Sequence, residues 1–148
     1  ESTTMRLTGN SSKSGLIPSL LRFMRQNPQL PVLGTCAGAI LLADPRDGKN
    51  SLIGSSIIRN GYGRQNESFQ TEIYSKLLMR NYPGIFIRAP KFSSIEDSNS
   101  VIATFGKDIV GVRKFNRIAL SFHPELSHDN GFHRWLLEQA IIYSEILA

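Results

Sequence analysis

The single cysteine of the chain, Cys36, lies in the stretch Gly-Thr-Cys-Ala-Gly at residues 34–38. The apolar run at residues 30–34 is typical of a buried strand, and residues 37–43 have the composition of a helix. This is the cysteine form of a nucleophile elbow, in which a strand turns sharply into a helix and exposes the reactive side chain. The head of the helix favours a thiolate, and the backbone N–H of Ala37 is placed to donate to an oxyanion. The pattern indicates a nucleophilic thiol, and a buried structural cysteine is the alternative.

A thiolate nucleophile needs a proton carrier, and the chain has three histidines: His123, His128 and His133. His123 ends a strand-like run, and Glu125 follows it after a proline, so that the two side chains share one face of an extended segment. Glu125 can then hold one imidazole nitrogen while the other faces Cys36, which predicts a Cys-His-Glu triad. In the alternative, the segment is a strand-end turn and Glu125 is only solvated. The other two histidines are expected at the surface, in or beside the last helix.

Length, composition and charge indicate one domain and argue against several classes of protein. The 148 residues, 41% of them hydrophobic and 20% charged, can bury a core. No apolar run approaches the ~20 residues that cross a bilayer, and one cysteine makes no internal disulfide, so we expect a cytoplasmic protein without membrane contact. The basic residues behind the net charge of +5 are scattered, which does not favour nucleic-acid binding. No cofactor is expected and no metal, since Cys36 and the histidines lack ligand pairs at helical spacing.

The elements that position these residues alternate at first between helix and strand. A helix near residues 16–27 precedes the strand and helix around Cys36. Farther along, the runs SVIATF, DIVGVR and RIALSF, separated by turn-sized gaps, predict an antiparallel meander. This order predicts an α/β sandwich with a mixed sheet. The remaining expected elements are apolar segments near 52–59, 67–74 and 84–88 and a last helix near 130–147, with Phe132, Trp135, Leu136, Ile142 and Tyr143 as its apolar residues.

Five stretches resemble the glutaminase subunits of pyridoxal phosphate synthase, the PdxT/SNO family of class I glutamine amidotransferases. The nucleophile elbow and the His-Pro-Glu segment are shared by the wider amidotransferase class, whereas RNGYGRQ and FIRAP are more specific to this family. The resemblance implies a flavodoxin-like α/β fold and hydrolysis of L-glutamine to glutamate and ammonia. It also implies a heteromeric complex with a synthase subunit, which receives the ammonia and builds the vitamin B6 cofactor. The five stretches are ESTTM (1–5), GTCAG (34–38), RNGYGRQ (59–65), FIRAP (86–90) and SFHPEL (121–126).

The resemblance also implies a role for each matching residue. Cys36 corresponds to the nucleophile, His123 to the general base and acid, and Glu125 to the carboxylate that orients the imidazole. These are the three residues that the spacing had already singled out, so both lines of reasoning predict one triad.

Five further residues match positions that bind glutamine in the family. Glu1 and Ser2 match part of the glycine-rich turn that holds the substrate, Arg59 matches the arginine of an Arg-Asn motif, and Ile87 and Arg88 match a pair that meets the substrate. A physical argument agrees for the arginines, because glutamine carries an α-carboxylate and a guanidinium satisfies a carboxylate with a planar fork of donors. Either arginine without its motif would be interpreted as a surface ion pair.

The chain departs from the family pattern in three ways. Gly61 stands where the family commonly has alanine or serine, and Ala39 stands where it often has leucine. The family also begins with a strand, a helix, a second strand and a glycine-rich loop that supplies a second oxyanion donor, and these have no counterpart here. We therefore expect residues 1–148 to form a single amidotransferase domain without its N-terminal strands. Two alternatives to a glutaminase stay open: a noncatalytic assembly module that docks on the synthase without a complete oxyanion hole, and another amidotransferase or cysteine hydrolase of the same fold.

Overall fold

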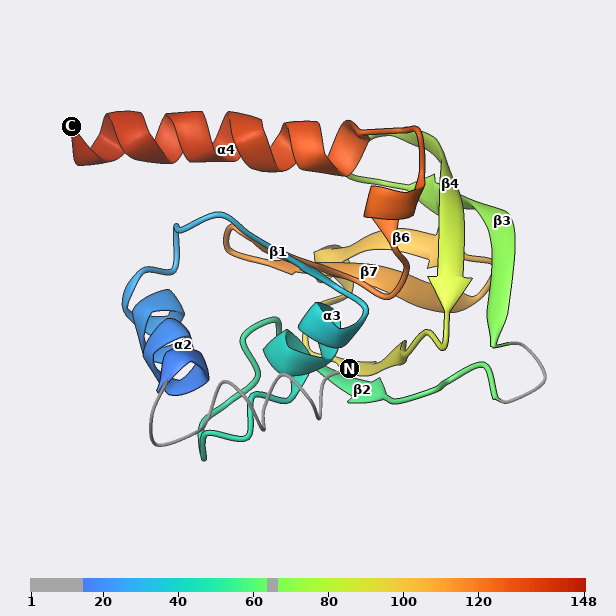
Figure 1. Ribbon diagram of the computed structural model, residues 1–148, viewed down its shortest axis with the longest axis horizontal. Helices are drawn as coiled ribbons and strands as arrows, with labels where there is room; N and C mark the ends of the chain where they lie inside the picture. Colours follow the sequence, from blue (N-terminus) through green and yellow to red (C-terminus); the bar gives the residue numbers. More distant parts are fainter. Residues whose placement is uncertain (1–14, 64–66) are drawn as a thin grey trace.

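A computed structural model describes residues 15–63 and 67–148 and contains a six-stranded mixed sheet with helices on both faces (Figure 1). The strand order is β1-β8-β7-β6-β3-β4, and β2 and β5 form a separate pair. The expected α/β architecture with a mixed sheet is therefore confirmed. The elements are α2 (Leu16–Gln26), β1 (Val32–Thr35), α3 (Ala37–Ala43), β2 (Ser55–Ile58), β3 (Ser68–Ser75), β4 (Arg80–Ile87), β5 (Lys91–Ile95), η2 (Ser98–Ser100), β6 (Val101–Phe105), β7 (Asp108–Lys114), β8 (Arg117–Leu120), η3 (Pro124–Leu126) and α4 (Gly131–Leu147).

The meander predicted from the sequence is formed by β6, β7 and β8, which pair antiparallel in chain order. Strand β1 adds to β8 in parallel, with Val32 opposite Arg117 and Thr35 opposite Leu120. Parallel strands finish at the same edge of a sheet. The residues that follow Thr35 and Leu120 are therefore brought to one edge.

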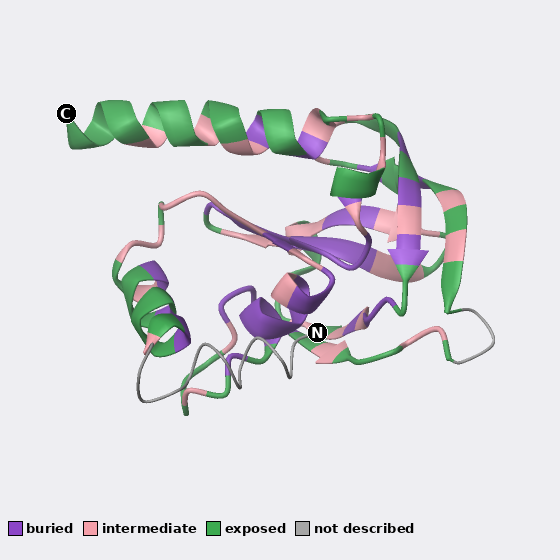
Figure 2. Ribbon diagram, viewed as in Figure 1, coloured by how far each residue is buried: buried purple, intermediate pink, exposed green. Residues whose placement is uncertain are grey.

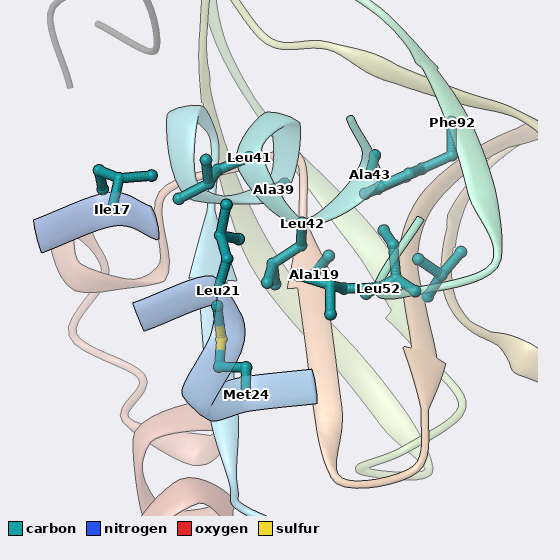
Figure 3. Close-up of a cluster of buried hydrophobic side chains, with 12 residues drawn as sticks. Ile17, Leu21, Met24, Ala39, Leu41, Leu42, Ala43, Leu52, Phe92 and Ala119 are labelled. Carbon is teal, nitrogen blue, oxygen red and sulfur yellow. The ribbon is translucent and has the colours of Figure 1, made fainter. Parts of the chain in front are cut away.

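Side chains alternate across β8 and separate two cores. Ile118 and Leu120 pack in the cluster that contains Phe132 and Trp135 of α4. Ala119 points the other way, into the cluster formed with α2 and α3 that Figure 3 shows. Because successive residues of an extended chain face opposite sides, the odd-numbered residues that continue from Ala119 point toward the face that carries α3.

The β3–β4 hairpin bends over the sheet. Its two strands pair along their whole length, but β3 joins β6 through only Tyr74 and Ser75. The far end of the hairpin therefore leaves the plane of the sheet, and the backbone N–H of His123 donates to the carbonyl of Ile85 at 2.8 Å. This contact brings the end of β4 to the edge where β1 and β8 finish.

The last helix differs from expectation in its second half. Phe132 and Trp135 are buried, but Ile142 is 48% exposed, because the helix continues past the described part of the sheet (Figure 2). Tyr143 is half-buried. Strand β5 is a second difference, since its range was not among the predicted segments. None of the helices within residues 15–63 and 67–148 has the length and apolar character that a membrane span requires.

We predict that Gly34→Ala destabilises the junction of β1 and α3. An added Cβ at residue 34 would lie 2.6 Å from Cδ1 of Leu42 and 2.9 Å from the carbonyl oxygen of Gly38. Since the carbonyl belongs to the backbone of α3, the helix must shift, which we expect to lower the free energy of unfolding by about 1–3 kcal/mol. Urea denaturation of both proteins measures this difference.

Gly38→Ala is the matched control. A Cβ at residue 38 meets no described atom within 4 Å. This variant should be as stable as the parent, or up to about 1 kcal/mol more stable, since alanine favours a helix. Equal stability of Gly34→Ala and the parent would contradict the close packing of β1 on α3.

Candidate active site

Cys36 occupies the sharp turn between β1 and α3, as the sequence pattern predicted. Its backbone has φ 48° and ψ −102°, a conformation that residues other than glycine rarely adopt. Two hydrogen bonds hold the turn: Cys36 N–H donates to the carbonyl of Leu120 at 2.9 Å, and Ile40 N–H donates to the carbonyl of Cys36 at 3.1 Å. Such a conformation costs on the order of 1–3 kcal/mol and persists only where the surroundings fix it. The fold therefore maintains this orientation of the cysteine at a cost in stability.

The thiol of Cys36 faces the end of β4. The residue is only 7% exposed, and its Sγ lies 3.7 Å from the carbonyl oxygen of Ile87, close enough for a weak S–H hydrogen bond. The following residue, Ala37, is buried and is the first residue of α3. The first four N–H groups of a helix have no acceptor within the helix, and the N–H of Ala37 is one of these four.

His123 and Glu125 contact each other directly. Nδ1 of His123 lies 2.5 Å from Oε1 of Glu125, and the two side chains are 13% and 45% exposed. The short turn η3 places Pro124 between them and brings the carboxylate beside the ring. This contact does not support the alternative in which Glu125 is only solvated. Since Nδ1 is engaged, Nε2 is the ring nitrogen that can exchange a proton with a substrate or a nucleophile.

The end of β4 connects Cys36 with His123. The carbonyl of Ile85 accepts from the backbone of His123, and the carbonyl of Ile87 lies against the thiol of Cys36. Carbonyls two residues apart in a strand are separated by about 7 Å. Cys36 and His123 are therefore anchored to neighbouring positions of one short segment. Sequence reasoning missed the role of Ile85, because a backbone carbonyl leaves no signal in the side-chain pattern.

A second ion pair fixes the loop that follows the turn η3. The guanidinium of Arg80 donates to both carboxylate oxygens of Asp129 at 2.5 Å and 2.9 Å. The hydroxyl of Tyr82 donates to the backbone carbonyl of Asp129 at 2.6 Å. Arg80 holds the pKa of the Asp129 carboxyl below its usual range, because the guanidinium donates to the ionised form. Strand β4 thus holds this loop through Arg80 and Tyr82 and also holds His123 through Ile85.

The residues predicted to bind substrate lie around the same segment. Ile87 contacts the thiol through its carbonyl, and Arg88 follows it with φ 46°. The Arg88 side chain is 72% exposed and forms a long ion pair of 3.8 Å with Glu67. Arg59 is exposed in the turn after β2. The structure thus brings Ile87 to Cys36 and places Arg88 next along the chain.

The turn that contains Arg59 is hydrogen-bonded to the segment that contains Arg88. Gly61 N–H donates to the carbonyl of Ala89 at 3.0 Å. The strands that flank the two segments, β2 and β5, also pair, with Ile58 opposite Lys91. Residues 59–63, the described part of the first motif, and residues 86–90 are therefore neighbours in space. Glu1 and Ser2 lie outside the described residues.

The described residues contain no cluster of side chains suited to a metal ion. Among residues 15–63 and 67–148, no three His, Cys, Asp or Glu side chains gather closely enough to hold one.

Comparison with known proteins gives one family and relatives that share one name. Residues 1–142 match the SNO glutamine amidotransferase family. The pyridoxal 5'-phosphate synthase subunit PdxT of Halalkalibacterium halodurans is 37% identical over 142 residues, which cover 93% of this chain and 70% of the relative. PdxT of Streptomyces griseus is 42% identical over 90% of this chain and 69% of its own. PdxT of Methanosphaera stadtmanae is 43% identical over 71% of this chain and 55% of its own.

Solved structures agree with this result. A crystal structure of a glutamine amidotransferase superposes with a TM-score of 0.79 at 35% identity, over 95% of this chain and 75% of that one. An amidotransferase from Thermotoga maritima superposes with a TM-score of 0.53 at 17% identity over 91% of this chain and 66% of that one, which supports the fold alone. This chain spans 55% to 70% of the three PdxT relatives named above. The family match over residues 1–142 does not support the alternative of another amidotransferase or cysteine hydrolase of the same fold. The chain belongs to the SNO glutamine amidotransferase family, with the flavodoxin-like α/β fold of the class I enzymes.

Proposed function

We propose that this protein is the glutaminase subunit of a pyridoxal 5'-phosphate synthase, with residues 1–148 forming one amidotransferase domain. In this role it hydrolyses L-glutamine to glutamate and ammonia and passes the ammonia to a synthase subunit for vitamin B6 biosynthesis. The observation that carries the proposal is the joint anchoring of Cys36 and the His123–Glu125 pair on the end of β4. The assignment to pyridoxal 5'-phosphate synthesis is inferred from the names of the PdxT relatives.

Each residue of the triad has one task in the proposed reaction. The thiolate of Cys36 attacks the carboxamide carbon of glutamine, and the N–H of Ala37 stabilises the oxyanion. The C–N bond then breaks, His123 protonates the leaving nitrogen, and ammonia departs from a glutamyl thioester. His123 next removes a proton from water, which attacks the thioester and releases glutamate and the thiolate. Glu125 holds the imidazole through Nδ1 and stabilises the imidazolium formed in between.

The arginines supply a site for the α-carboxylate of glutamine. Arg88 is largely exposed, and a 3.8 Å ion pair in solvent contributes little stability, so its guanidinium can exchange Glu67 for a ligand carboxylate. Arg59 belongs to the neighbouring turn, whose Gly61 N–H donates to the carbonyl of Ala89, and the carbonyl of Ile87 lies against the thiol. We assign Glu1 and Ser2 to the same pocket on the family resemblance. We also place the reaction in the cytoplasm, where a catalytic thiol stays reduced.

The first experiment measures glutamate release by the full-length protein mixed with its synthase subunit. The parent should hydrolyse glutamine, and Cys36→Ser should lose hydrolysis, because a neutral hydroxyl at this turn is a poorer nucleophile than a thiolate. The same variant should bind the synthase subunit and unfold at the temperature of the parent. Full activity of Cys36→Ser would contradict the triad. A parent that binds the synthase and hydrolyses no glutamine would instead support the noncatalytic assembly module.

A second experiment concerns the carboxylate pocket. We expect Arg59→Ala and Arg88→Ala to raise the KM for glutamine about ten- to hundredfold, since losing a hydrogen bond to a charged group costs about 1.5–3 kcal/mol. Steady-state kinetics at saturating glutamine should show a smaller change in kcat. Arg22→Ala, an exposed arginine on α2, is the matched control and should behave as the parent. Unchanged KM values in both pocket variants would refute this assignment.

A further inference from the structure

Three aromatic side chains, Phe69, Phe86 and Tyr62, pack together at the end of β4, the segment that contacts Cys36 and His123. Phe86 is fully buried between Ile85 and Ile87, whose carbonyls contact His123 and Cys36. Phe69 stacks on Phe86 with ring centroids 4.7 Å apart and an interplanar angle of 6°. The ring of Tyr62 meets Phe69 and Phe86 edge-on, at 5.1 Å and 5.8 Å. Tyr62 belongs to the turn that carries Arg59, so the aromatic group spans both substrate-binding motifs.

Lys91 packs against the ring of Tyr62. Its Nζ lies 4.4 Å from the centroid of the Tyr62 ring and 3.3 Å from a carboxylate oxygen of Asp108. The stem of Lys91 also fills the space beside Gly61, where an added Cβ would overlap the lysine Cβ and Cγ. This packing gives a physical reason for glycine at a position where the family commonly has alanine or serine. Lys91 thus packs against two residues of the Arg59 turn.

The hydroxyl of Tyr62 is buried near the carboxylate of Asp108, the same carboxylate that pairs with Lys91. Among the described residues no partner lies within hydrogen-bond distance of its oxygen, so the hydroxyl adds little to the contact. Burial, assisted by the charge of Asp108, raises the pKa of Tyr62 well above its usual value, so the ring stays neutral. The electron-rich face of the ring beneath the ammonium is therefore the useful part of the side chain.

Both connected segments contain a strained residue. Asn60 has φ 50° and Arg88 has φ 46°, and neither is a glycine. Residues in this region keep their conformation only when neighbouring contacts hold them. The Tyr62–Lys91 contact lies between the two segments, together with the hydrogen bond from Gly61 to Ala89.

We propose that Tyr62 and Lys91 are positioning residues for glutamine: their cation–π contact fixes the Arg59 turn against the Ile87–Arg88 segment, so that both guanidinium groups reach one carboxylate. The inference rests on the proposed function and deepens it. It gives Tyr62 and Lys91 a role in substrate binding, although neither residue contacts the substrate or the reacting atoms in this proposal. It also couples the two residues, because each acts through the other.

The test measures KM and kcat for glutamine in the full-length protein with its synthase subunit. Tyr62→Leu and Lys91→Met should raise KM roughly three- to thirtyfold, the range expected for a lost cation–π contact, and change kcat less. The double variant should be no worse than either single variant. Tyr62→Phe and Lys91→Arg keep the ring and the charge and should stay close to the parent. Lys114→Met is the matched control, since Lys114 also combines an ion pair, with Glu96, and a ring contact, with Phe115, away from the site.

Other outcomes overturn the inference. A purely structural role would lower the unfolding temperature of Tyr62→Leu and Lys91→Met without changing KM below that temperature. Additive effects in the double variant, or a Tyr62→Phe variant as impaired as Tyr62→Leu, would contradict the contact as the cause. Calorimetric titration of glutamine into Cys36→Ser, with and without Tyr62→Leu, separates this inference from catalysis. Binding that is equal in the two proteins overturns the positioning role alone, and a parent that neither binds nor hydrolyses glutamine overturns the proposed function and the inference with it.

Discussion

Four residues of parallel pairing between β1 and β8 place the ends of both strands at one edge of the sheet. The hydrogen bond from Cys36 N–H to the carbonyl of Leu120 extends this pairing by one residue, into the turn itself. Cys36 and the strand that leads to His123 therefore share one backbone ladder. Since a register shift of one residue would turn every side chain of β8 to the opposite face, the same pairing decides both the core packing and the side on which His123 lies.

The end of β4 packs against this edge of the sheet and completes the candidate site. Its carbonyls at residues 85 and 87 contact His123 and Cys36, and the residues that follow carry the motif expected to meet the substrate. Strain gathers here, because Cys36 and Arg88 both have positive φ. The ring of Tyr62 packs against Phe86 and is itself in contact with the ammonium group of Lys91. This segment is buried at Phe86 and exposed at Arg88.

Local patterns predicted the parts of the site that lie within a few residues of sequence. The elbow at Cys36 and the pair of His123 and Glu125 are such cases, because a turn or a two-residue spacing determines each of them. The return of β4 to the end of β8 could not be predicted, since a backbone carbonyl at Ile85 has no signature in the sequence. The exposure of Ile142 was also missed, because periodicity shows an apolar face of a helix but not how far the sheet beneath it extends.

The most direct test of the account is the rate at which a chloroketone analogue of glutamine alkylates the full-length protein. The modified residue is identified by peptide mass in the parent and in Glu125→Gln. The account predicts modification of Cys36, protection by glutamine, and a rate at least about tenfold lower in Glu125→Gln, because the amide no longer stabilises the imidazolium beside the thiolate. Iodoacetamide, which does not resemble glutamine, controls for general access to the thiol. Modification at another residue, or equal rates in the two proteins, would contradict the proposed Cys36–His123–Glu125 triad.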